Sequence, residues 1–221
     1  MSALSNTVLQ RLDPAHSALL VIDMQNDFCA EGGYVETAVG KDASACRAVA
    51  APIMDLVRNA RRSGVPVYWV IAIYDTDKVP PNMLAKQRER SMDVCCGTGS
   101  WGAGFFGVEP LENETVIAKH CFSAFQGTDL EQQLRERSIR TVVFTGVQTN
   151  ICVETSLRDG FCRGFNVVLA EDCVASHTKP LHDATVANTR FLFGDVLGGV
   201  DIAGAWRENT AVAKVGATAA L

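Results

Sequence analysis

The part of the sequence that most constrains the fold is residues 141–156, TVVFTGVQTNICVETS, where an uncharged run gives way to a helical pattern. Residues 141–145 are β-branched and aromatic, which is typical of a strand that is buried on both faces. Gly146 is expected to end this strand, and from about Cys152 onward apolar residues recur at four-residue steps. We therefore expect Cys152 at a strand-to-helix turn, in or near the first turn of the helix.

Uncharged runs alternate with amphipathic segments along the rest of the chain, and this alternation predicts an α/β fold with a mostly parallel sheet covered by helices on both faces. We predict one domain that spans residues 1–221. Residues 75–110 carry no long regular pattern, and a segment of this length is expected to be functional, an oligomer contact, or both. Besides the helix of Cys152, the predicted strands are residues 18–22, 65–74, 115–118, 141–145, 166–170 and 193–196, and the predicted helices are residues 43–62, 128–137, 184–191 and from 203 onward.

Composition excludes several classes of protein. The chain has 221 residues, 48% hydrophobic and 20% charged, which is typical of a globular protein and not of a disordered one. Its net charge is −5 and its basic residues cluster only at 86–90, so nucleic acid and anionic membranes are not expected partners. The sequence shows no signal peptide, and its eight cysteines lack zinc-ligand spacing, which favours a cytoplasmic protein with reduced thiols.

Charged residues directly follow two of the predicted strands, Asp23 after the first and Lys119 after the third. A carboxylate at the end of a buried strand is costly unless it is used, and the carboxyl ends of parallel strands share one edge of the sheet. Asp23, Lys119 and Cys152 are therefore expected to converge. Simpler interpretations are a turn-capping aspartate, a surface lysine and an inert buried cysteine.

Together the three side chains are chemically complete for acyl transfer. The ammonium of Lys119 favours the thiolate of Cys152, and the carboxylate of Asp23 can accept the thiol proton and pass it to a leaving amine. Attack on a carbonyl would give a thioester, which water activated by Asp23 would hydrolyse. The residues thus predict a hydrolase that acts through Cys152.

Three segments resemble the cysteine hydrolases of the isochorismatase-like superfamily. They are DMQNDF at residues 23–28, Lys119 with FSAF at 122–125, and TGVQTNICVETSLRDGF at 145–161. The resemblance extends roughly over residues 18–196. It implies a three-layer α/β/α sandwich around a parallel six-stranded sheet, assembled as homodimers or homotetramers.

The resemblance also implies roles for single residues. Asp23 would be the base and proton shuttle, Lys119 the electrostatic partner, and Cys152 the nucleophile. A cis peptide bond between Val147 and Gln148 would direct the N–H of Gln148, together with that of Cys152, into an oxyanion hole.

Within the superfamily, this sequence resembles the metal-free amidohydrolases. The enzymes that hydrolyse vinyl ethers do not need the cysteine, so Cys152 argues against that branch. Nicotinamidases place a metal site of one aspartate and two histidines after the second strand, where this chain has DTDKV at residues 75–79. No histidine lies between His16 and His120, so we expect neither a metal nor another cofactor.

The predicted substrate is a small amide or ureide such as ureidoacrylate, biuret or an N-carbamoyl compound. The motifs GGY at residues 32–34 and GSW at 99–101 are most similar to those of ureidoacrylate and biuret hydrolases. Thr189 stands where a biuret hydrolase is expected to carry a substrate-binding glutamine, which argues against biuret. The expected apolar walls of the substrate pocket are Phe28, Tyr34 and Trp101.

Three alternatives remain open from the sequence. The chain could act on another small amide, of the maleamate or nicotinamide type. It could be a non-catalytic member of the fold in which Cys152 senses oxidants. It could also hydrolyse a vinyl ether, an activity that would survive Cys152→Ala. The basic residues Lys86, Arg88 and Arg90 could reach a substrate carboxylate or form a solvated face.

Overall fold

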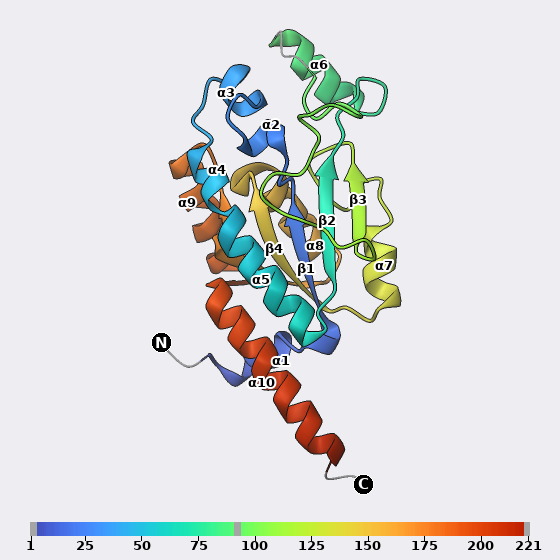
Figure 1. The fold of residues 1–221 in the computed structure, drawn as a ribbon, viewed down its shortest axis with the longest axis vertical. Helices are drawn as coiled ribbons and strands as arrows, with labels where there is room; N and C mark the ends of the chain where they lie inside the picture. Colours follow the sequence, from blue (N-terminus) through green and yellow to red (C-terminus); the bar gives the residue numbers. More distant parts are fainter. Residues whose placement is uncertain (1–3, 91–93, 219–221) are drawn as a thin grey trace.

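The computed structural model describes residues 4–90 and 94–218, with side chains for residues 4–90 and 94–211. Its centre is a sheet of six parallel strands in the order β3-β2-β1-β4-β5-β6 (Figure 1). Every residue of the central strands β1 and β4 is buried, as their uncharged sequences predict. The strands are β1 (Ser17–Ile22), β2 (Val67–Ala72), β3 (Thr115–Lys119), β4 (Thr141–Val147), β5 (Asn166–Ala175) and β6 (Asp195–Leu197).

Helices cover both faces of the sheet, because successive side chains of a strand point to opposite faces. Leu19 and Val21 belong to the core shared with α5 and α10, whereas Leu20 and Ile22 belong to the core shared with α7 and α8. The predicted three-layer α/β/α architecture is therefore confirmed. These helices are α5 (Ala50–Ser63), α7 (Leu130–Glu136), α8 (Glu154–Cys162) and α10 (Gly199–Thr218).

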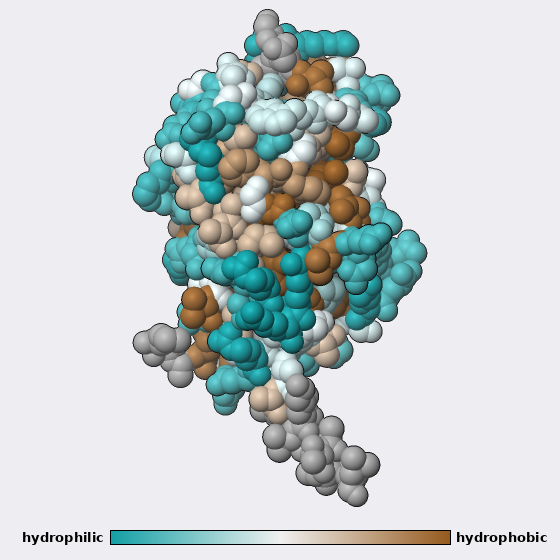
Figure 2. All heavy atoms as spheres, viewed as in Figure 1, coloured by the Kyte–Doolittle hydropathy of each residue, from teal (hydrophilic) through white to brown (hydrophobic). Residues whose placement is uncertain are grey.

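The outer side of α5 is hydrophilic, and short helices lie over the edge at which the strands end (Figure 1 and Figure 2). Hydrophilic side chains gather over the lower end of α5, which turns its apolar side to the sheet (Figure 2). The carboxyl ends of the strands lie in the upper half of Figure 1, beneath the short helices α2 and α3 and the helix α6. No helix in the described ranges has the length and apolarity needed to cross a bilayer. The other helical elements are α1 (Asn6–Arg11), η1 (Pro14–His16), α2 (Asn26–Cys29), α3 (Tyr34–Thr37), α4 (Ser44–Ala48), α6 (Pro81–Glu89), η2 (Thr149–Val153), α9 (Lys179–Asn188) and η3 (Thr189–Phe193).

The prediction that Gly146 ends its strand is wrong, because β4 continues through it to Val147. Gly146 has a φ of 106°, and a Cβ at this position would lie 2.0 Å from the carbonyl oxygen of Ile22. Glycine is therefore what allows β4 to lie close against β1 at this point. Gly146 and Val147 thus extend β4 to the edge of the sheet at which Asp23 lies.

Several predicted bounds also differ from the structure. The helix predicted at 43–62 is divided into α4 and α5 at Val49, the strand predicted at 65–74 spans only β2, and α9 begins before 184. The strand predicted at 166–170 continues to Ala175, because Glu171 and Asp172 are exposed beside a register shift and interrupt no buried contact.

The described part of residues 75–110 contains one helix, α6, that the sequence pattern did not indicate. Pro81 occupies its first turn, a position that proline favours because a free N–H is not needed there. None of the residues of α6 is fully buried, so the helix lacks the apolar stripe by which helices are recognised in sequence.

Candidate active site

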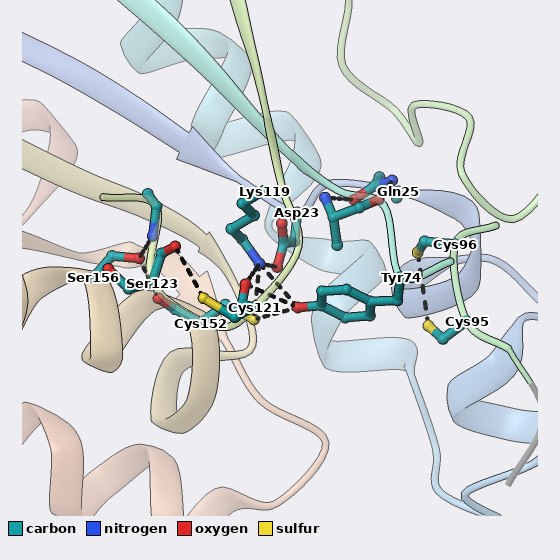
Figure 3. A network of polar contacts seen from close by, with 12 residues as sticks. Asp23, Gln25, Tyr74, Cys95, Cys96, Lys119, Cys121, Ser123, Cys152 and Ser156 are labelled. Carbon is teal, nitrogen blue, oxygen red and sulfur yellow. Dashed lines mark hydrogen bonds and ion pairs between the residues drawn. The ribbon is translucent and has the colours of Figure 1, made fainter. Parts of the chain in front are cut away.

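Asp23 follows β1 directly and is completely buried. Its backbone N–H donates to the carbonyl of Val70 at 2.8 Å, which keeps the residue fixed to the neighbouring strand. Its φ of 53° lies in the left-handed region, which aspartate adopts more readily than most residues. The side chain is thereby held at the carboxyl edge of the sheet (Figure 3).

Lys119 is the last residue of β3 and is also completely buried. β2 lies between β3 and β1, so the lysine side chain extends past the end of β2 to reach Asp23. Its Nζ atom lies 2.9 Å from Asp23 Oδ2 and 3.4 Å from Cys152 Sγ. One ammonium group therefore bridges the carboxylate and the sulfur (Figure 3).

Cys152 lies in the short π-helix η2 between β4 and α8, which confirms its expected place at a strand-to-helix turn. Its carbonyl accepts a hydrogen bond from Ser156 Oγ at 2.6 Å, and that hydroxyl in turn accepts from the N–H of Ala124 at 2.9 Å. These bonds fix η2 to the loop after β3. The structure thus brings Asp23, Lys119 and Cys152 together, as expected.

Burial and neighbouring charges set the protonation of this group. Burial raises the pKa of Asp23 despite the attraction of Lys119. Burial opposes the charge of Lys119, but the attraction of Asp23 and Cys152 outweighs it and raises the pKa of the lysine. Burial and the charge of Asp23 raise the pKa of the Cys152 thiol to about 12, although Lys119 opposes that shift. The resting site therefore holds a charged lysine and a thiol beside a carboxylate of enhanced basicity.

The Asp23 carboxylate keeps unused acceptor capacity. Apart from its ion pair with Lys119, neither of its oxygens accepts a geometrically complete hydrogen bond from the described residues. A buried carboxylate with few donors is costly, and the thiol of Cys152 is a proton source close to it. The arrangement can therefore move a proton from sulfur to carboxylate while Lys119 neutralises whichever group is charged.

The peptide bond between Val147 and Gln148 is cis, as the family resemblance implies. The side chain of Gln148 is fixed, since its Oε1 accepts from the N–H of His177 at 2.9 Å and from Cys46 Sγ at 3.4 Å. The assignment of the Gln148 and Cys152 backbone N–H groups to an oxyanion hole stays a prediction.

A cavity of about 580 Å³ opens above Cys152, within the range typical of small-molecule sites. Phe28 and Tyr34 line it, as expected for its apolar walls. The expectation for Trp101 is wrong, because its side chain lies outside the lining and the residue is 60% exposed. The backbone of that loop contacts α2 through a 2.7 Å hydrogen bond from Asn26 to the carbonyl of Trp101. Thr189 is buried in η3 and does not line the cavity either.

Sequence reasoning missed two polar side chains of the site. The hydroxyl of Tyr74 lies 3.0 Å from Lys119 Nζ and 3.7 Å from Cys152 Sγ. Gln25 pairs with the end of β2, where its amide accepts from the N–H of Ala72 at 2.7 Å and donates to its carbonyl at 3.0 Å. The only signal in the sequence was position, because both residues follow strands that end at this edge.

Among the described residues, one group of side chains has the donor atoms and the spacing to hold a metal. The ligand atoms of Asp27, Cys95 and Cys96 all lie within 4.8 Å of one another. The carboxylate of Asp27 already accepts from the backbone N–H groups of Cys96 at 2.6 Å and Tyr34 at 3.3 Å. The group is therefore hydrogen-bonded within the protein, and its carboxylate anchors the loops on either side.

Comparison with known proteins gives consistent matches. Residues 17–199 match the family model described as the isochorismatase domain. A ureidoacrylate amidohydrolase, RutB of Methylobacterium radiotolerans, is 36% identical over 198 residues, which cover 83% of this chain and 76% of that protein.

Solved structures agree with this family match. The isochorismatase family protein of Desulfovibrio vulgaris is 27% identical, with a TM-score of 0.72 over 84% of this chain and 95% of that one. The N-carbamoylsarcosine amidase of Thermoplasma acidophilum is also 27% identical, with a TM-score of 0.66 over 83% of this chain and 96% of that one.

Removing the lysine should destabilise the protein through the charge that it leaves behind. Lys119→Met is expected to lower the free energy of unfolding by about 3–5 kcal/mol, because Asp23 would remain buried and uncompensated. The double variant Asp23→Asn, Lys119→Met should recover most of that loss, since it contains no buried charge. Urea unfolding of both variants measures the difference, and equal losses would contradict this account.

Proposed function

The chain belongs to the isochorismatase family, and from this premise we propose that it hydrolyses a carbon–nitrogen bond of a small amide or ureide through a thioester on Cys152. The observation that carries the proposal is the ammonium of Lys119, which lies 2.9 Å from Asp23 Oδ2 and 3.4 Å from Cys152 Sγ beneath a cavity. The activities named for its relatives, on ureidoacrylate and N-carbamoylsarcosine, support the same reaction class.

In the proposed reaction, Asp23 accepts the thiol proton as the sulfur of Cys152 attacks the carbonyl carbon. The carbonyl oxygen becomes an oxyanion, which the backbone N–H groups of Gln148 and Cys152 receive. Collapse of this intermediate breaks the carbon–nitrogen bond, and the protonated Asp23 gives its proton to the leaving nitrogen. Water then attacks the thioester, with Asp23 again accepting a proton. As the carbon–sulfur bond breaks and the acid product leaves, Asp23 returns this proton to the sulfur and the thiol is regenerated.

The electrostatics of the site favour hydrolysis over the sensing of oxidants. Burial raises the pKa of Asp23, which makes its carboxylate a stronger base for the thiol proton. A redox-sensing cysteine needs a low pKa and free access to solvent. Cys152 is 5% exposed and burial raises its pKa to about 12, so its proton is removed only with help from Asp23.

We further propose that the substrate carries a carboxylate. The residues of α6 that line the cavity recur at three- and four-residue steps and form one face of the helix. Arg90 and Lys86 are on this face, whereas Asp23, the one acidic residue among the described residues of the lining, is neutralised by Lys119. The lining residues of α6 and its C-terminal cap are Asn82, Met83, Lys86, Gln87 and Arg90.

Among the described residues, neither Lys86 nor Arg90 is held in a buried ion pair. Lys86 is paired with Glu89 at 3.0 Å, but both side chains are exposed, and such pairs contribute little. A guanidinium binds a carboxylate through two parallel hydrogen bonds, which favours Arg90 as the main contact. The two cations and the apolar walls together predict the substrate. It is a short unsaturated or aliphatic acid with a ureide or amide at the end far from its carboxylate.

Loss of the nucleophile or the base should abolish turnover without unfolding the protein. Cys152→Ser and Asp23→Asn are each expected to lower ammonia release from ureidoacrylate-like ureides by about 10³-fold or more, since the members of such a group act together. Cys162→Ser, which changes an exposed thiol outside the cavity, is the matched control. Activity of Asp23→Asn at the control level would show that the proposed base is wrong.

The carboxylate proposal has its own test. Arg90→Ala should raise the KM for a ureido acid about tenfold, because a charge-assisted hydrogen bond is lost, and should leave the KM for its uncharged amide unchanged. Arg88→Ala removes the same group from the same helix but outside the cavity lining, and should change neither value. Steady-state kinetics on both substrates measure the effect. Equal changes in the two variants would refute a role for Arg90.

We also propose that the protein acts in the cytoplasm as a homodimer or homotetramer. All eight cysteines are free thiols, which fits a reducing compartment. Phe191 and Leu192 are adjacent in η3 and are 86% and 65% exposed, and apolar side chains so exposed on one chain are commonly covered in an assembly. Light scattering on the purified protein should give a mass of two or four chains, and the mass of one chain would refute the assembly.

A further inference from the structure

Tyr74 places a hydroxyl in direct contact with the reacting atoms. The residue follows β2 and is 4% exposed, and its backbone N–H donates to the carbonyl of Cys96 at 3.4 Å. Its ring stacks edge-on against Phe122, with centroids 6.4 Å apart. The side chain is therefore held between the cavity and the triad, and Figure 3 shows its hydroxyl directed at Lys119 and Cys152.

The ammonium of Lys119 has more acceptors than protons. It lies 2.9 Å from Asp23 Oδ2, 3.0 Å from the hydroxyl of Tyr74, 3.1 Å from the carbonyl of Cys121 and 3.4 Å from Cys152 Sγ. An ammonium donates three hydrogen bonds, and three oxygens occupy the shorter contacts. Four acceptors therefore share three N–H protons, so the sulfur competes with three oxygens for the hydrogen bonds of Lys119.

The hydroxyl proton of Tyr74 has two possible acceptors. Since this oxygen accepts from Lys119, its own proton points either to the carbonyl of Cys121 at 3.4 Å or to Cys152 Sγ at 3.7 Å. The carbonyl of Cys121 already accepts from Lys119 at 3.1 Å. A negatively charged sulfur is the stronger acceptor of the two, because hydrogen bonds to charged groups are the stronger ones.

We propose that the hydroxyl of Tyr74 donates a hydrogen bond to the Cys152 thiolate and thereby stabilises the charged nucleophile that the proposed function requires. No proton leaves Tyr74 in this step, because the thiol proton goes to Asp23. While the sulfur is a neutral thiol, the hydroxyl turns to the carbonyl of Cys121. The contact is therefore stronger for the thiolate than for the thiol, which is the condition for an effect on rate.

The surroundings keep Tyr74 a donor. Burial and the charge of the Cys152 thiolate raise its pKa well above the ordinary value, so the hydroxyl stays protonated while the sulfur ionises. The same hydrogen bond acts on the thiol in the opposite direction and lowers the pKa of Cys152. The hydrogen bond from Tyr74 thus opposes the rise in the pKa of Cys152 that burial and Asp23 cause.

The test is the titration of Cys152, which needs no substrate. In an Asp23→Asn background the carboxylate charge that raises the thiol pKa is absent, so the thiol titrates in a lower range. Tyr74→Phe in this background is expected to raise the pKa of Cys152 by about one unit, a tenfold smaller thiolate fraction, because a hydrogen bond to a charged group is lost. Alkylation of the Cys152 peptide by iodoacetamide across pH, followed by mass spectrometry, gives the pKa.

The matched control is Tyr68→Phe. Tyr68 lies in β2, is as deeply buried, and its hydroxyl has no hydrogen-bond partner among the described residues. This variant should leave the titration of Cys152 unchanged. Equal pKa values in the two variants would overturn the proposal, whether or not the protein hydrolyses any amide. With Asp23 intact, Tyr74→Phe should also lower kcat/KM for the best ureide about tenfold with little change in KM.

A second measurement covers the case in which Tyr74→Phe does not fold, as judged by circular dichroism. The chain has three tyrosines, so Asp23→Asn protein produced with 3-fluorotyrosine carries the stronger phenol donor at position 74. The double variant Asp23→Asn, Tyr68→Phe, produced in the same way, removes the contribution of position 68. If the pKa of Cys152 is lower in both fluorinated proteins than in the same proteins with ordinary tyrosine, the proposal is supported. An unchanged pKa overturns it.

Discussion

The buried ion pair of Lys119 and Asp23 is the interaction on which the rest of the site depends. Two charges removed from water are expensive, and the structure retains them within 2.9 Å of each other at the carboxyl edge of the sheet. Cys152 joins the pair through Lys119, so negative charge can move from carboxylate to sulfur while the ammonium stays in place. Because the positive charge does not move, the protein need not reorganise as the proposed nucleophile forms.

The sheet makes this pair possible by the order and the lengths of its strands. Lys119 and Asp23 belong to strands that are separated by β2, and β2 ends at Ala72, which leaves room for the lysine side chain to pass. Gln25 then occupies the hydrogen-bonding groups of Ala72 that a longer strand would have used. Tyr74 follows two residues later and supplies its hydroxyl from the same place.

Reaction and substrate recognition are contributed by different parts of the chain. The proposed reacting groups lie on the sheet edge and on η2, where backbone pairing fixes them. The cavity walls come from α2, α3 and α6, which connect or follow the strands. Connecting segments can vary without disturbing the sheet, so members of one family can keep the triad and change the acid or amide that they accept. In this chain Lys86 of α6 and Arg90 at its C-terminal cap place positive charge on the wall of the cavity.

The sequence by itself determined the order of the strands along the chain, the parallel sheet and the convergence of Asp23, Lys119 and Cys152. Uncharged runs mark buried strands, and parallel strands must end at one edge, so local information was sufficient there. Only the tertiary structure decided the continuation of β4 through Gly146, the helix α6, the exposure of Trp101 and the contact of Tyr74 with sulfur. Each of these depends on atoms distant in sequence, such as the carbonyl of Ile22 against Gly146 or Lys119 beside Tyr74. Periodicity reports which side of an element is apolar, and it carries no information on which distant residue that side will meet.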